Sequence, residues 1–190
     1  KCAAPPPNTS GRPVFSAYCP ERDVVLSFKL PSYIGVWYEV SAYPSDYKIG
    51  LNCTAAQYGL AGNGTMSINS SAVLSNGTGV SMTGYAVPTF NSSLGEFNLH
   101  FDGRPYVDDG STKYFVLATD YTSYSFVWSC NNLNTNPPSH WEDLGILSRT
   151  PALAPATINR WMSRLGLNQS LLIPTPQPCA SPPPTTPKPN

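Results

Sequence analysis

Charged residues are scarce in this chain. Asp, Glu, Lys and Arg make up 12% of its 190 residues, about half of the usual ~25%. The 11 basic residues balance the 11 acidic ones, so the formal net charge is zero. A nucleic-acid-binding surface needs concentrated positive charge, and this balance therefore argues against nucleic acid as a partner.

Long apolar runs are also lacking, and the chain has only two histidines. No segment approaches the ~18–20 apolar residues of a membrane helix, so no membrane span is predicted. The five cysteines are too widely spaced for a zinc site. No Ser–His–Asp set, carboxylate pair or metal cluster is apparent, and we predict neither a catalytic residue nor a metal site.

The chain is rich in the motif Asn-x-Ser/Thr, which accepts N-linked glycans in secreted proteins. The candidate glycosylation sites are Asn8, Asn63, Asn69, Asn76, Asn91 and Asn168. A seventh motif, at Asn52, is the weakest because Cys53 lies inside it and is available for a disulfide. Glycans would supply the solubility that charged residues, scarce in this chain, usually provide. The alternative is that the motifs arise by chance from a composition rich in Asn and Ser. Lys1 in place of Met fits a processed secretory chain, so we expect secretion.

Proline concentrates at the two ends of the chain and divides it into three parts. Residues 1–18 form a Pro-rich leader, 19–179 one folded domain, and 180–190 a disordered tail rich in Pro and Thr. Such tracts favour extended, solvated backbone and bury no core.

The central part consists of short runs in which apolar and polar residues alternate. In Glu96–Phe101, Phe97 and Leu99 alternate with Asn98 and His100, a period of two that is typical of a half-sheltered strand. The eight predicted strands are 36–43, 53–60, 65–71, 79–87, 96–101, 114–119, 124–130 and 144–148. Turn-forming residues separate them, which indicates a meandering antiparallel sheet, either a sandwich or a barrel.

One amphipathic helix follows the last strand. Ile158, Trp161, Met162 and Leu165 recur with helical spacing, and Gly166 suits the helix end. We expect this helix to pack on the outside of the sheet.

Three motifs, in this order, resemble those of the lipocalin family. They are Gly35-Val36-Trp37, Thr119-Asp120-Tyr121, and Arg149 before a Thr-Pro pair. The resemblance covers roughly residues 19–179 and is closest to the apolipoprotein D and insect bilin-binding branch. It implies an all-β fold: an eight-stranded antiparallel up-and-down barrel with one C-terminal α-helix packed outside.

Each motif has a structural role in this interpretation. Trp37 is expected to plug the narrow end of the barrel, with Arg149 across its indole in a cation–π contact. Asp120 is expected to cap backbone N–H groups in the turn between Thr119 and Tyr121.

The resemblance also implies a disulfide pattern. Cys19 would pair with Cys130, and Cys53 with Cys179. Cys2 has no counterpart in that scheme, and is either free, capped or bridged to a second chain in a homodimer.

The inward faces of the predicted strands define the candidate ligand-binding residues. These are Ala56, Tyr58, Met66, Ile68, Val80, Met82, Phe97, Leu99, Phe115 and Leu117. Tyr43 and Tyr47 are expected near the open end, with His140 and Trp141 at the mouth, although His140 is also compatible with an ordinary surface loop. The set suits a flat or elongated hydrophobic molecule; the alternative is that it merely fills a closed core.

Two features of this set bear on the ligand. No Lys or Arg falls in it, so a ligand carboxylate has no predicted partner. Gly145 stands where relatives often carry an aromatic residue, and its small size would widen that wall or shift the ligand.

The leading functional interpretation is extracellular binding and transport of a small hydrophobic ligand. The resemblance favours a bilin pigment such as biliverdin as the bound chromophore, with a retinoid, steroid, carotenoid or fatty acid as alternatives. A lipid-isomerising enzyme would need a cysteine thiolate in the barrel, and the barrel cysteines are expected in disulfides. A glycoprotein interaction module, crosslinked through Cys2, is the third interpretation. No cofactor for catalysis is expected.

Overall fold

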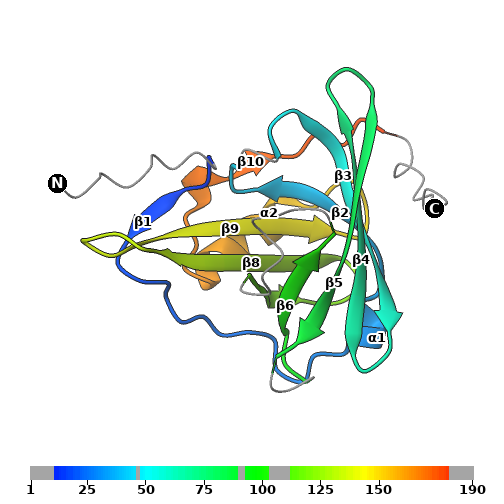
Figure 1. Ribbon diagram of the computed structural model, residues 1–190. Coiled ribbons are helices and arrows are strands. Elements are labelled where there is room, and N and C mark those ends of the chain that lie inside the picture. Colours follow the sequence, from blue (N-terminus) through cyan, green and yellow to red (C-terminus); the bar gives the residue numbers. More distant parts are fainter. Residues whose placement is uncertain (1–10, 46–47, 90–92, 103–111, 180–190) are drawn as a thin grey trace.

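Eight antiparallel strands close into a barrel with a helix on the outside (Figure 1). The computed structural model describes residues 11–45, 48–89, 93–102 and 112–179. The barrel strands are β2 (Gly35–Ala42), β3 (Leu51–Ala61), β4 (Thr65–Leu74), β5 (Gly79–Pro88), β6 (Glu96–Phe101), β7 (Lys113–Thr119), β8 (Tyr124–Leu133) and β9 (Ser139–Ser148). All eight predicted strands are confirmed. Pairing of β9 with β2 closes the sheet, which decides between barrel and sandwich.

Several short elements were not predicted, because each is too short to show a period. β1 (Val14–Ser16) pairs with β9, and β10 (Ile173–Pro174) pairs with β2. Helix α1 (Leu30–Tyr33) precedes β2, and the 3₁₀ turn η2 (Gln169–Leu171) follows α2. β1 belongs to the segment predicted to be a leader, so sheet pairing begins before Cys19. Among the predicted positions, Cys2, Asn8, Tyr47 and Asn91 lie outside the described residues.

The external helix α2 (Pro155–Arg164) is confirmed in position and packing. Met162 is fully buried, and Ile158, Trp161 and Leu165 pack against the same outer cluster as strands β8 and β9. The chain leaves the helix at Gly166, whose φ of 63° lies in the left-handed region that glycine adopts without strain. The helix therefore covers the outer surface of the barrel and leaves its interior clear.

Arg149 and Trp37 close the narrow end of the barrel. The Arg149 guanidinium lies 3.8 Å from the centre of the fully buried Trp37 ring. It also donates hydrogen bonds of 3.0–3.2 Å to four backbone carbonyls, those of Ser32, Tyr33, Val36 and Tyr121. The cation–π contact is confirmed, and the carbonyl bonds explain why an arginine fork is needed there.

Asp120 organises the turn between β7 and β8. Its Oδ1 accepts the backbone N–H groups of Thr122, Ser123 and Tyr124 at 3.1, 2.7 and 3.0 Å. Partial burial acts to raise the pKa of Asp120, but the hydrogen bonds outweigh it and the pKa is lowered. The predicted capping role is confirmed.

Two disulfides tie the chain ends to the barrel wall. Cys19 is bonded to Cys130 and Cys53 to Cys179, the pairs that the family resemblance implies. Each closes a loop of more than 100 residues, which in the loop-entropy account stabilises the fold by about 4–5 kcal/mol before any strain.

Candidate functional site

The barrel contains a cavity of about 270 Å³ in the described part of the chain. Its lining is mainly apolar and comes from strands all around the barrel. Seven of the predicted residues line it: Ala56, Tyr58, Ile68, Val80, Met82, Leu99 and Trp141. Because Trp37 and Arg149 close one end, the cavity belongs to the opposite half, where β9 begins.

Met66 and Phe97 point inward but do not line the cavity. Both are almost fully buried, and both belong to the packed inner cluster that contains Trp37. These two residues therefore fill the packed core, which is the alternative to ligand contact that the sequence left open.

Phe115 and Leu117 face the other way, and the prediction that they point inward was wrong. Both pack in the outer cluster with α2. Their neighbour Tyr114 lines the cavity instead, and Val116 joins the inner cluster. Strand β7 is apolar on both faces, so hydrophobicity alone does not fix its phase.

Tyr43 follows the end of β2 that lies away from Trp37, at the open end as expected, but it does not line the cavity. It is buried in the outer cluster, and its hydroxyl accepts the backbone N–H of Asn168 at 2.9 Å. Burial raises the pKa of Tyr43 to about 12. This tyrosine fixes the segment after α2 against the barrel.

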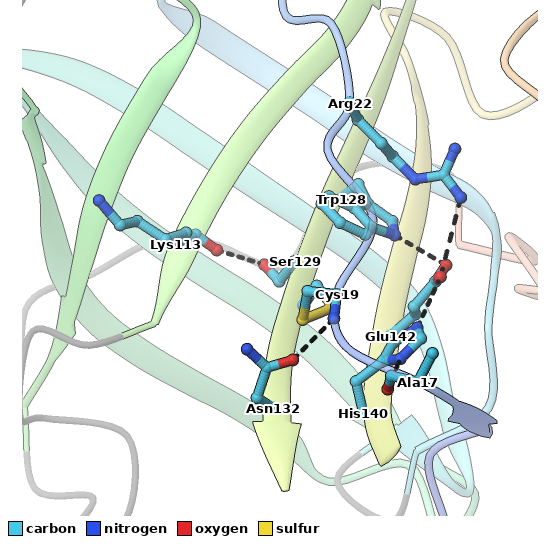
Figure 2. Close-up of a disulfide and its surroundings, with 10 residues drawn as sticks. Ala17, Cys19, Arg22, Lys113, Trp128, Ser129, Asn132, His140 and Glu142 are labelled. Atoms are coloured by element: carbon cyan, nitrogen blue, oxygen red, sulfur yellow. Dashed lines mark hydrogen bonds and ion pairs between the residues drawn. A yellow bond between two sulfur atoms is a disulfide. The ribbon is translucent and has the colours of Figure 1, made fainter. Parts of the chain in front are cut away.

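His140 does not line the cavity either, although it lies beside Trp141 on β9. Figure 2 shows its ring beside Ala17 of the N-terminal segment. Its Nδ1 donates to the carbonyl of Ala17 at 2.8 Å, and its Nε2 lies 3.3 Å from Glu142 Oε1. Glu142 also accepts Trp128 Nε1–H at 2.9 Å. His140, which was predicted to contact the ligand, instead binds the N-terminal segment to the barrel.

Sequence analysis missed a chain of hydroxyl groups at the inner end of the cavity. The Tyr58 hydroxyl lies 3.0 Å from that of Tyr114, which lies 3.3 Å from that of Tyr33. Tyr33 in turn lies 2.8 Å from Ser125 Oγ. Burial raises the pKa of Tyr58 to about 12 and also raises the pKa values of Tyr33 and Tyr114 above their ordinary value. Tyr58 and Tyr114 therefore offer neutral hydroxyls to a cavity that is otherwise largely apolar.

A charged cluster on the cavity wall was also missed. Lys48 Nζ lies 3.2 Å from Glu39 Oε2 and 3.0 Å from Asp143 Oδ1, and all three residues line the cavity. Gly145 lies beside this cluster, and a Cβ atom there would lie 3.5 Å from Glu39 Oε2, an ordinary van der Waals distance. The expectation that no cation lines the cavity was wrong for Lys48 and for Arg12. Counting back by twos from Leu147 along β9 would have placed Asp143 inward.

Two other features bear on the class of protein. Within the residues described, no helix is both long and apolar enough to cross a bilayer. Nor do three or more His, Cys, Asp or Glu side chains gather there in a way that could hold a metal ion. What the described chain does present is a barrel closed at one end with a cavity inside it, the architecture of a small-molecule binding barrel.

Comparison with known proteins identifies the family. Residues 28–177 match the Lipocalin-like domain. Apolipoprotein D of Rattus norvegicus is 31% identical over 150 residues, which cover 79% of this chain and 76% of that protein. The chain belongs to the lipocalin family.

Solved structures agree with this assignment. The structure of insecticyanin from the tobacco hornworm Manduca sexta has a TM-score of 0.72 and 26% identity, covering 87% of this chain and 89% of that one. Lobster apocrustacyanin A1 shares the fold at a TM-score of 0.65 and 20% identity, covering 79% and 80% of the two chains.

Proposed function

We propose that this lipocalin binds a small hydrophobic molecule in its barrel cavity and carries it outside the cell. The observation that carries the proposal is the 270 Å³ cavity itself, which is walled largely by apolar side chains and closed at one end by Trp37. Burying apolar ligand surface contributes roughly 25 cal/mol per Å², so shape and area would supply most of the affinity.

A bilin such as biliverdin is our first candidate for the ligand. Similarity to Manduca sexta insecticyanin and the motif resemblance to the insect bilin-binding proteins support it. The wall also suits this class of molecule, since hydroxyls of Tyr58 and Tyr114 stand beside apolar surfaces of Ile68 and Leu99. A retinoid, steroid, carotenoid or fatty acid is the alternative.

A non-catalytic role is part of the proposal. The thiol-dependent alternative requires a free thiolate in the barrel, and Cys53 and Cys130 are both bonded. Two disulfides also suit an oxidising, extracellular compartment. The glycosylation motifs at Asn63, Asn76 and Asn168 lie in turns outside the strands, where a glycan would not disturb sheet pairing. We propose that these three asparagines carry glycans. The alternative to the carrier function is an interaction protein whose chains are linked through Cys2 in a homodimer.

Native mass spectrometry of the untreated protein, with an absorbance spectrum, tests the ligand class directly. A retained bilin would add its mass and a red-region band. If the protein is colourless and binds retinol or a steroid, the bilin is excluded as the ligand, whereas the proposed carrier function is retained.

A matched pair of variants tests the site. Met82 lines the cavity, whereas the next residue, Thr83, is exposed on the outer face of β5. Met82→Trp should reduce ligand affinity at least ~10-fold by filling the cavity, and Thr83→Trp should leave it unchanged. Equal affinities in both variants would place the ligand outside the barrel and contradict the proposal.

A further inference from the structure

The hydroxyl groups at the inner end of the cavity form an unbranched chain. The Tyr58 hydroxyl lies 3.0 Å from that of Tyr114, which lies 3.3 Å from that of Tyr33. The Tyr33 hydroxyl in turn lies 2.8 Å from Ser125 Oγ. The Tyr58 ring stacks on the Tyr33 ring, which packs against Trp37 at the closed end of the barrel. The chain therefore runs from the cavity wall into the packed core beside Trp37.

This chain holds more hydroxyl protons than it has hydrogen bonds. Burial raises the pKa values of the three phenols, so each of the four hydroxyls keeps its proton at neutral pH. Three contacts join the four hydroxyls, and each contact uses one proton. One proton, called here the spare proton, is therefore left without an acceptor inside the chain.

The surroundings decide which hydroxyl holds the spare proton. Tyr33 and Ser125 are fully buried and do not line the cavity. Within the described residues, their hydroxyls contact only each other and Tyr114, so a spare proton on either would lack an acceptor, which is costly in a buried position. Tyr58 and Tyr114 both line the cavity, where a guest can accept the proton. The chain therefore presents a hydrogen-bond donor to the inner end of the cavity.

We propose that Tyr58 and Tyr114 select a guest with a carbonyl oxygen at its inner end, to which one of the two hydroxyls donates the spare proton. This inference rests on the proposed carrier function and narrows its ligand to molecules with such a carbonyl group. The group is neutral, because the burial that disfavours a phenolate also disfavours an ionised guest group. A bilin meets the requirement through the lactam carbonyls of its end rings, and a keto steroid through its ketone.

A matched pair of steroids tests the donor by affinity. Androstanone, with its ketone on ring A, is compared with androstane, which has a methylene group in that place, and both are measured by displacement of a fluorescent apolar dye. Tyr58→Phe/Tyr114→Phe should lower the affinity for the ketone about 10-fold and leave that for the hydrocarbon unchanged. Both hydroxyls are removed together, because Tyr114 would hold the spare proton in Tyr58→Phe alone.

Tyr18→Phe/Tyr85→Phe is the matched control. It also removes two phenol hydroxyls, but from exposed side chains that do not line the cavity. Both steroid affinities should stay unchanged in this variant. Equal loss of ketone and hydrocarbon affinity in Tyr58→Phe/Tyr114→Phe, or no loss of either, would contradict the donor role of the two tyrosines.

Infrared spectroscopy of bound androstanone, isotope-labelled at its carbonyl carbon, tests the hydrogen bond in the unmodified protein. The carbonyl stretching band should lie at lower wavenumber than in a hydrocarbon solvent, because a hydrogen bond weakens the C=O bond. An unshifted band overturns the inference, even where the double variant fails to fold, and leaves the carrier function standing. Absence of binding by both steroids contradicts the carrier function and this inference with it.

Discussion

Arg149 shows how much a single side chain can carry in this fold. It stacks on Trp37 and donates hydrogen bonds to four backbone carbonyls at the closed end. Arg149→Met keeps the apolar stem but removes every hydrogen bond. We expect a loss of about 2–4 kcal/mol in the free energy of unfolding, measured by urea denaturation. Arg160→Met, on the exposed side of α2, should cost less than about 0.5 kcal/mol; similar losses for the two variants would contradict this account.

Gly145 is the cavity-wall residue that lies beside the Glu39 carboxylate and the Val127 side chain. A Cβ atom there would lie 3.1 Å from Val127 Cγ2 and 3.5 Å from Glu39 Oε2. Gly145→Phe should therefore crowd the wall, displace the Glu39 carboxylate and reduce ligand affinity at least ~10-fold, with a stability loss of about 1–3 kcal/mol. Calorimetric titration and thermal unfolding measure the two effects. A variant that binds the ligand more tightly would show that the glycine leaves an unfilled gap.

Sequence reasoning succeeded at residues whose role follows from a local motif. Trp37, Asp120 and Arg149 were placed correctly because each lies in a short pattern with one structural meaning. It failed at Arg12 and Lys48, because their positions depend on how distant segments meet at the mouth of the barrel. The spacing of residues in the sequence does not predict which distant segments lie next to one another there.

The same distinction holds for whole strands. Alternation placed β4 and β5 correctly, since one face of each carries polar side chains. β7 carries apolar residues on both faces, because its outer face packs in the same cluster as α2, and a register shift falls between Val116 and Ala118. A strand that is buried on both faces shows no alternation of apolar and polar residues, so its inward face cannot be predicted from the sequence. This is why Phe115 and Leu117 were assigned to the wrong face.

The external helix depends on one deeply buried residue. Met162 is fully buried in the outer cluster, whereas Arg160 on the same helix is exposed. Met162→Ala should lower the free energy of unfolding by about 2–4 kcal/mol because it opens a cavity beneath the helix. Ligand affinity should not change, since α2 lies outside the barrel. Arg160→Ala serves as the control in both measurements, and a large affinity loss in Met162→Ala would mean that the helix shapes the interior.

At the scale of the whole molecule, the hydroxyl chain joins elements far apart in the sequence. Tyr33 comes from α1, Tyr58 from β3, Tyr114 from β7 and Ser125 from β8. All three phenols are buried, and burial favours their neutral forms. Ionisation of any of these phenols is therefore expected to destabilise the closed half of the barrel.

This arrangement predicts that the protein loses stability in alkali. Burial raises the pKa of Tyr58 to about 12, above its ordinary value of 10.0, so the folded protein binds this proton more tightly than the unfolded chain. The stabilisation is complete below pH ~10 and is lost as the pH rises toward 12, at up to about 1.4 kcal/mol per pH unit for each such tyrosine. Urea denaturation between pH 9 and 11.5 measures the slope. Tyr58→Phe should reduce the slope of the unfolding free energy against pH by up to about 1.4 kcal/mol per pH unit. Tyr18→Phe, at a side chain that is 65% exposed, should leave the slope unchanged. An identical slope in both variants would mean that Tyr58 ionises freely within the folded barrel.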